Sequence, residues 1–183
     1  MRIITGKYKG RVIKAPQGIR PTEERVRKAF FDIMGDISGL SFLELFAGSG
    51  AMGFEALSQG ASTVLFVEKN RQAVKAIEDN LQALRIANQA ELIAADVLEI
   101  LPVIAKKGCK FDLIFLDPPY YEGMAEKTLQ RLAEYDILQN SGYLIVQHFR
   151  KDPIPKQTGG FVVFKQSKYG STMLSFFRME GNP

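Results

Sequence analysis

Short apolar runs alternate with stretches of helical spacing from Ser41 onward, and this alternation limits the possible folds more than any other feature. The apolar runs predict strands at residues 42–46, 63–67, 91–94, 111–116 and 143–146. The stretches between them predict helices at about 51–59, 70–84, 97–105 and 124–135. Strands that alternate with helices along a chain form a parallel α/β sheet, because each helix carries the chain back across the sheet.

The C-terminal part of the chain breaks this alternation. Residues 161–165 and 172–177 are apolar and flank a Tyr169-Gly170-Ser171 turn, with no helical stretch between them. Two such runs predict an antiparallel hairpin. The expected fold is therefore a mostly parallel, seven-stranded α/β sheet that ends in a hairpin.

Residues 1–38 are predicted to be a small extension of the main domain, which we expect to span residues 39–183. Residues 2–4 and 11–13 predict a short β-ribbon around a Lys7-Tyr8-Lys9 tip. A helix is expected to follow, with Thr22 as its N-cap. Helical spacing predicts that this helix buries the side chains Val26, Ala29, Phe30 and Ile33.

Positive charge is concentrated in this extension. Residues 1–28 carry nine lysines and arginines against two glutamates, a net charge of +7 in a chain whose total is +4, which leaves −3 for the rest. A basic segment on a mildly acidic body is typical of proteins that bind polyanions. We therefore expect a nucleic-acid partner.

Several kinds of protein are disfavoured by composition. No apolar run approaches the roughly 20 residues of a membrane helix, and the first residues lack the apolar segment of a signal peptide. The single Cys109 cannot form an internal disulfide. The single His148 cannot supply a two-histidine metal site, and we expect it to be an ordinary residue at a strand end. We expect an intracellular, cytoplasmic protein without a metal.

Ligands of parallel α/β sheets bind beyond the carboxyl ends of the strands, and the first strand is followed by a glycine-rich turn. This turn spans residues 44–50, and Gly53 follows it. Glycines let the chain pass close to a ligand, and the next helix offers its N–H groups. Residues 48–53 also fit the pattern G-x-G-x-x-G, so a dinucleotide-binding fold is an alternative.

Acidic residues end the next two strands. Glu68 can accept hydrogen bonds from both hydroxyls of a ribose, although it could also be a plain surface acid. Asp96 suits the amine of an adenine whose ring packs on Val97, although aspartate is equally common as a helix N-cap.

Asp117-Pro118-Pro119-Tyr120 follows the fourth strand and forms a corner suited to a planar amine. Proline has no N–H, so a carboxylate and carbonyl oxygens, which are all acceptors, dominate this corner. The Tyr120 ring offers a face on which a nucleobase could stack, a contact that contributes roughly 1–3 kcal/mol.

Together these motifs resemble the S-adenosylmethionine-dependent amino-methyltransferases. Five of them resemble the RsmD family of 16S ribosomal RNA (guanine-N2)-methyltransferases: residues 6–10, residues 20–22 with 25–27, residues 46–50, residues 117–120 and residues 169–172. One departure is Gln147-His148, where such proteins often have an acid.

The resemblance implies a Rossmann-like class I methyltransferase fold, S-adenosylmethionine as cofactor, and 16S ribosomal RNA or a partly assembled small subunit as partner of a monomer. The implied catalytic residues are Asp117, Pro118, Pro119 and Tyr120. The implied cofactor site comprises Glu44, Phe46, Ala47, Gly48, Gly50, Glu68, Lys69, Asp96, Val97 and Asp117. The implied RNA contacts are Lys7, Lys9, Arg11, Arg20, Thr22, Arg25, Arg27 and Tyr121.

Three alternatives stay open at this point. A DNA adenine-N6 methyltransferase would share the corner at residues 117–120, but the chain offers no segment large enough to read duplex sequence. An NAD-dependent oxidoreductase would use Gly48, Gly50, Gly53 and Glu68, and would leave that corner unexplained. A non-catalytic RNA-binding protein would need neither pocket.

Overall fold

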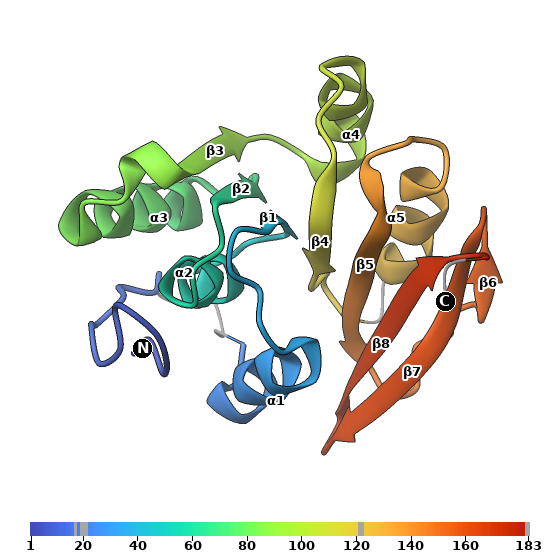
Figure 1. The fold of residues 1–183 in the computed structure, drawn as a ribbon, viewed down its shortest axis with the longest axis horizontal. Helices are drawn as coiled ribbons and strands as arrows, with labels where there is room; N and C mark the ends of the chain where they lie inside the picture. Colours follow the sequence, from blue (N-terminus) through green and yellow to red (C-terminus); the bar gives the residue numbers. More distant parts are fainter. Residues whose placement is uncertain (17, 19–21, 121–122, 182–183) are drawn as a thin grey trace. The chain divides into compact units, whose positions relative to one another are not determined.

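The computed structural model describes residues 1–16, 18, 22–120 and 123–181, which form two compact units, Met1–Asp96 and Val97–Pro183. Each unit combines β-strands with α-helices (Figure 1). The expected division of the chain at residue 38 stays a prediction. Among the described residues, no helix is both long enough and apolar enough to cross a bilayer.

The first unit contains a parallel three-stranded arrangement in the order β3-β2-β1. Its strands are β1 (Ser41–Leu45), β2 (Thr63–Glu68) and β3 (Ala90–Ala94). Helix α2 (Ala51–Ser58) packs on β1 and β2, α3 (Arg71–Leu84) packs on β3, and a short 3₁₀ helix, η1 (Ala87–Gln89), leads into β3. The predicted boundaries of the three strands and of α2 and α3 are confirmed to within one residue, whereas η1 was not predicted.

Helix α3 shows why the position of a helix could be predicted from the sequence. Its N-cap is Asn70, whose side-chain oxygen accepts hydrogen bonds from the backbone N–H groups of Gln72 and Ala73 at 2.9 and 3.1 Å. The residues Ala73, Ile77 and Leu81, spaced by four, are buried against the sheet. Local capping and helical periodicity agree here, so the helix begins where the sequence predicts.

The N-terminal segment forms the expected ribbon, reduced to one antiparallel bridge between Arg2 and Val12. The N–H of Ile3 donates to the carbonyl of Arg11 at 3.0 Å, and the N–H of Ile13 donates to the carbonyl of Met1 at 2.8 Å. The apolar side chains Ile3 and Ile13 are buried.

Helix α1 (Glu24–Met34) corrects two expectations. Its N-cap is Glu23, without a side-chain capping bond, so Thr22 does not cap it. Its buried residues are Val26, Arg27, Phe30 and Phe31, whereas Ala29 and Ile33 are half-buried. The buried face of α1 therefore includes Arg27 and Phe31 and differs from the face that helical spacing of the apolar residues predicts.

The N-terminal segment is tied to α2 by Glu55, whose side chain is completely buried. One carboxylate oxygen accepts from the N–H of Ile4 at 2.9 Å. The other accepts from the N–H and the hydroxyl of Thr5 at 2.8 and 2.6 Å. The segment therefore belongs to the packed structure of the first unit.

Ser58, one turn further along α2, holds the tip of the same segment. Its carbonyl accepts from the N–H of Lys7 at 2.7 Å, and its hydroxyl accepts from the N–H of Tyr8 at 2.9 Å. Gly6 has a φ of +73°, and a Cβ built there would lie 1.9 Å from the Ser58 carbonyl oxygen. Only glycine allows the backbone to approach α2 this closely.

The second unit has the strand order β4-β5-β8-β7-β6. Its strands are β4 (Phe111–Leu116), β5 (Leu138–Phe149), β6 (Gln157–Thr158), β7 (Phe161–Tyr169) and β8 (Thr172–Met179). The β4–β5 pair is parallel and the other pairs are antiparallel. Helices α4 (Val97–Lys106) and α5 (Met124–Leu132) pack on each other.

The predicted hairpin is confirmed as β7 and β8, but seven strands were expected and the described residues form eight. The additional strand, β6, is only two polar residues long and pairs with the start of β7. Its sequence, Gln157-Thr158, carries no apolar run, so periodicity could not reveal it. Strand β5 begins at Leu138, five residues earlier than expected, and α5 ends at Leu132.

His148 lies in the core of the second unit, as expected for an ordinary residue of a strand. Its Nδ1 lies 2.9 Å from the carbonyl oxygen of Phe149, and its Nε2 lies 2.8 Å from the Ser175 hydroxyl. Gln166 donates to the same hydroxyl at 2.9 Å. A neutral ring protonated at Nδ1 satisfies all these groups, whereas a second ring proton would oblige the Ser175 hydroxyl to turn its hydrogen away.

The buried glutamate gives the first prediction. Glu55→Gln replaces one acceptor oxygen by an NH₂ group that faces backbone N–H donors, and we expect a loss of about 1–3 kcal/mol of unfolding free energy. Urea unfolding measures the loss, and hydrogen exchange should show faster exchange at Ile4 and Thr5. The exposed Glu78→Gln on α3 is the control. Equal stability of both variants would contradict this role of Glu55.

His148 gives the second prediction. Burial lowers its pKa below the ordinary value of 6.5. The unfolded chain therefore takes up this proton at a higher pH than the folded chain does. Stability should be fully present above about pH 6.5 and should fall as the pH drops towards the lowered folded pKa.

Thermal unfolding between about pH 7.5 and pH 5.5 tests this, because His148 is the only histidine in the chain. The variant His148→Gln should lose most of the pH dependence in this range. The same slope in both proteins would show that other groups cause it.

Candidate cofactor and amine sites

A sharply folded turn joins β1 to α2. Phe46, Gly48 and Gly50 have φ values of +57°, +55° and +73°. The N–H of Gly50 donates to the carbonyl of Ala47 at 2.7 Å, and α2 begins at the next residue. A positive φ is uncommon for a bulky residue such as phenylalanine and marks backbone strain, which concentrates at functional sites.

Glu44 supports this turn from below. Its side chain is 3% exposed, and its two oxygens accept from the N–H groups of Met52 and Gly53 at 3.2 and 2.8 Å. The carboxylate thus satisfies the first turn of α2 and its positive dipole end. Glu44 therefore shapes the turn, and its expected contact with the cofactor stays a prediction.

Glu68 connects the turn to the end of β2. One carboxylate oxygen accepts from the N–H of Gly48 at 2.7 Å, and the other accepts from the N–H of Asn70 at 2.8 Å. An ionised carboxylate has about four lone-pair positions, so these two bonds leave capacity for ligand hydroxyls. Ribose binding by Glu68 stays a prediction, and the carboxylate also has a structural role that the sequence did not show.

The end of β3 lies beside the end of β2, since Ala94 pairs with Glu68. There the Lys69 ammonium lies 3.0 Å from the Asp96 carboxylate in an exposed ion pair. Val97 is 3% exposed and belongs, with Leu101, to the buried face of α4, and its expected contact with adenine stays a prediction. In the first unit, the turn, Glu68, Lys69 and Asp96 all follow the carboxyl ends of neighbouring strands.

The amine corner of the second unit follows β4. Asp117 is half-buried, Pro118 is buried and Pro119 is exposed. One oxygen of the Asp117 carboxylate accepts a hydrogen bond from the Gln147 side chain at 2.7 Å. The register explains this contact, since Leu116 on β4 pairs with Val146 on β5 and each is followed by one of the two residues.

Gln147 is a functional candidate that the sequence analysis left without a role. Its side chain is 5% exposed, and among the described residues its amide oxygen has no hydrogen-bond partner. Leaving such a buried acceptor unpaired costs of order 1–3 kcal/mol. The contact between Gln147 and Asp117 depends on the register of β4 and β5, which cannot be read from the sequence.

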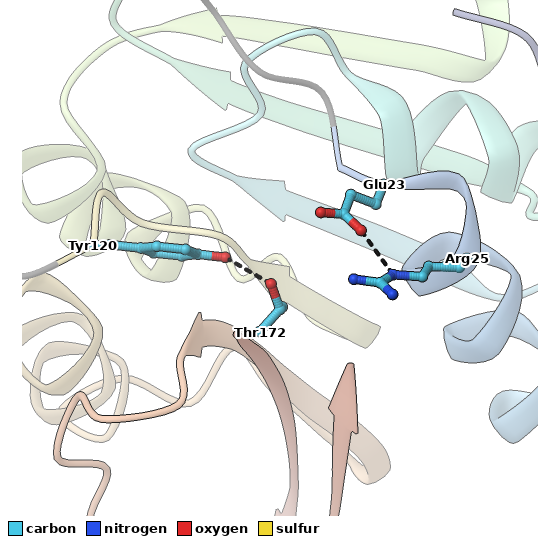
Figure 2. A network of polar contacts seen from close by, with 4 residues as sticks. All are labelled: Glu23, Arg25, Tyr120 and Thr172. Carbon is cyan, nitrogen blue, oxygen red and sulfur yellow. Dashed lines mark hydrogen bonds and ion pairs between the residues drawn. The ribbon is translucent and has the colours of Figure 1, made fainter. Parts of the chain in front are cut away.

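Tyr120 contacts residues of β5 and β8 in the same unit. Its hydroxyl lies 3.4 Å from the hydroxyl of Thr172 (Figure 2). Its ring centroid lies 6.2 Å from that of Phe149, and Phe149 pairs with Thr172 across β5 and β8. The C-terminal hairpin therefore orients this ring. Tyr121 lies outside the described residues.

The residues expected to contact RNA divide into three groups. Lys7, Lys9 and Arg11 are exposed on the segment that Glu55 and Ser58 hold against α2. Arg25 is exposed and bonds to Glu23 at 2.7 Å (Figure 2), and Thr22 is half-buried. Arg20 lies outside the described residues.

Arg27 is the correction in this set. Its side chain is 2% exposed, and its guanidinium donates to the sulfur of Met1 and the carbonyl of Arg2, both at 3.0 Å. Burial lowers its pKa, and the nearby charge of Glu55 opposes that shift. Arg27 therefore packs the N-terminal segment against α1 and is not available to a phosphate.

Among the described residues, no group of three or more histidine, cysteine, aspartate or glutamate side chains is arranged to hold a metal ion. Parallel strands with a strained glycine-rich turn, followed by acids at successive strand ends, are the features of α/β methyltransferases that use S-adenosylmethionine.

Comparison with known proteins agrees. A solved structure of yhhF from Escherichia coli superposes with a TM-score of 0.87 at 29% identity and covers 100% of this chain and 99% of that one. The protein TTHA0928 from Thermus thermophilus gives a TM-score of 0.85 at 30% identity, with 98% and 99% coverage.

Curated relatives carry a more specific description. The ribosomal RNA small subunit methyltransferase D of Haemophilus influenzae is 35% identical over 158 residues, 84% of this chain and 81% of that protein. The Escherichia coli K12 protein of the same name is 29% identical over 183 residues, with 98% and 90% coverage. The profile of the family described as "Conserved hypothetical protein 95" matches residues 1–178. The chain belongs to this family, the RsmD family of ribosomal RNA methyltransferases.

Proposed function

We propose that this protein transfers a methyl group from S-adenosylmethionine to the exocyclic N2 amine of a guanine in 16S ribosomal RNA. The observation that carries the proposal is the corner after β4, where a carboxylate fixed by Gln147 precedes two prolines and an oriented tyrosine. The names of the relatives support ribosomal RNA of the small subunit as the substrate class. Guanine N2 as the target follows from the family resemblance.

The first unit supplies the residues that would hold the donor. The glycine-rich turn lets the donor approach the backbone closely, Glu68 suits its ribose hydroxyls, and Asp96 suits its adenine amine. The bound donor supplies an electrophilic methyl group on a sulfonium. Lys69 balances the charge of Asp96 at this end of the site.

The second unit supplies the residues that would hold the acceptor. The guanine amine is a weak nucleophile, because its lone pair is delocalised into the ring. Asp117 and the carbonyl of Pro118 would accept its two hydrogens and direct the lone pair at the methyl carbon. Such positioning can contribute roughly 7–11 kcal/mol to lowering a barrier.

The proposed step conserves atoms and charge. A nitrogen–carbon bond forms while the sulfur–carbon bond breaks, and the electron pair of the broken bond stays on sulfur. The methylated amine then carries a positive charge and is acidic enough to lose one proton to Asp117. The chain needs no stronger base.

The guanine must leave its stack to reach this corner, which costs a few kcal/mol and least for an unpaired nucleotide. Stacking on Tyr120 offsets part of that cost. Lys7, Lys9, Arg11 and Arg25 would bind phosphates and so position the RNA without reading its sequence. We propose a cytoplasmic monomer that acts on 16S ribosomal RNA or on a partly assembled small subunit.

Asp117→Ala gives the third prediction. We expect methyl transfer to fall on the order of 10²- to 10³-fold or more, because the amine loses its charged acceptor. Affinity for S-adenosylhomocysteine should change little. Tritium transfer into small-subunit RNA and calorimetry with S-adenosylhomocysteine measure the two effects.

The exposed Asp136→Ala, in the same unit, is the matched control. An equal loss of cofactor binding and methyl transfer would mean that Asp117 binds the donor. Mass spectrometry of the labelled RNA tests the target, since N2-methylguanosine supports the proposal and N6-methyladenosine contradicts it.

The basic segment gives the fourth prediction. Lys7→Ala combined with Arg11→Ala should weaken RNA binding and reduce the slope of log affinity against log salt by about 1.5–2. Filter binding at several salt concentrations measures the slope. The control is Lys106→Ala with Lys107→Ala, two exposed lysines at the end of α4. An unchanged slope in the first variant would remove the segment from the RNA interface.

A further inference from the structure

Asp117, which is half-buried, and Gln147, which is buried, form one polar pair at the ends of two parallel strands. The Gln147 Nε2 donates to Asp117 Oδ2 at 2.7 Å, and the pairing of Leu116 with Val146 sets the two residues side by side. Gln147 is almost fully buried, with 5% of its surface exposed. Its side chain is therefore confined by packing as well as by this bond.

The orientation of the amide is chosen by the carboxylate. A glutamine amide has an NH₂ donor end and an oxygen acceptor end. Turning it round would set its oxygen against an ionised carboxylate, with two acceptors facing each other. Among the described residues, the oxygen as placed is buried and has no partner. The amide is thus oriented to donate to Asp117 although its own oxygen is left without a hydrogen bond. A buried polar atom without a partner calls for a functional explanation.

We infer that Gln147 is the positioning residue of the amine site: it fixes the rotamer of Asp117 by donating to Oδ2. This inference rests on the proposed function. The amide occupies one of about four lone-pair positions of the carboxylate and leaves the group an acceptor towards a substrate amine. A hydrogen bond to the charged form also favours that form.

A neutral donor has a second consequence for the proposed reaction. Gln147 has no acidic proton, so it cannot protonate Asp117 and cancel its charge. When the methylated amine releases its proton, the proton goes to Asp117 and then to solvent, and the amide hydrogens remain on Gln147. A glutamate at this position would share a proton with Asp117, because two carboxylates in contact cannot both ionise easily.

Two substitutions separate positioning from folding. Gln147→Leu keeps a similar volume without a donor, and we expect kcat to fall roughly 100-fold while KM for RNA and affinity for S-adenosylhomocysteine stay close to those of the natural protein. Gln147→Glu should retain activity at low pH, where its protonated carboxyl donates to Asp117 as the amide does. Its activity should then fall as the pH rises from about 6 to about 9 and the pair loses its shared proton.

The matched control is Gln157→Glu. Gln157 also donates to a carboxylate, that of Glu180 at 2.9 Å, but on the exposed edge of the same unit. This variant should keep both the activity and the pH profile of the natural protein. Tyr120 and His148, which are close to Asp117 and Gln147 along the chain, are bonded to Thr172 and Ser175 and are unchanged in all variants.

A measurement without turnover makes the inference independent of the activity assay. Carboxyl ¹³C resonances of Asp117 should titrate at a higher pH in Gln147→Leu than in the natural protein, because the charged form has lost its donor. An unchanged titration, or a Gln147→Glu profile parallel to that of the natural protein, overturns the role of Gln147. An inactive natural protein with the shifted titration would overturn the proposed function alone.

Discussion

Three buried glutamates, Glu44, Glu55 and Glu68, hold the first unit together, and each does so by accepting hydrogen bonds from backbone N–H groups. A carboxylate oxygen bonded to backbone N–H groups is a charge-assisted contact, stronger than a bond between neutral groups. The backbone groups satisfied in this way lie where no strand or helix partner exists: the glycine turn, the first turn of α2 and the N-terminal segment. The shape of the donor side of the site therefore depends on charges that stabilise the backbone around it.

In the second unit, strand register positions the residues of the amine corner. Parallel pairing of β4 and β5 sets Asp117 beside Gln147, and antiparallel pairing of β5 and β8 sets Phe149 beside Thr172, which contacts Tyr120. Sheet hydrogen bonds fix such neighbours to within a residue, because a slip of one position would turn every side chain to the opposite face. The hairpin at the C-terminal end thus contributes to the amine corner although its own residues take no part in the proposed chemistry.

The elements were predictable because periodicity and capping are local, as in α3, whereas the support of the site depends on contacts between distant residues. Glu44 and Glu68 look alike in the sequence, each an acid in or at the end of a strand. Only the direction of the side chain, which alternates along a strand, decides that Glu44 points under the turn. Arg27 was misplaced for the related reason that a charged side chain on a helix is expected in water unless a partner is known. Its partners, Met1 and Arg2, come from a segment whose packing on α1 no local pattern reveals.

Anchoring the basic segment also changes what RNA binding would cost. A flexible basic arm loses backbone and side-chain freedom when it binds, which reduces its net affinity. Here Glu55 and Ser58 fix the backbone of residues 4–8 before any ligand arrives, and Gly6 permits the close contact with α2 that makes this possible. Lys7 and Lys9 therefore present their charges from a rigid loop, and mainly their side chains remain to be ordered. Both parts of the proposed function thus depend on preorganisation. In the first unit the buried carboxylate of Glu55 fixes the segment that carries the phosphate-binding cations, and in the second unit the buried amide of Gln147 fixes the carboxylate of Asp117.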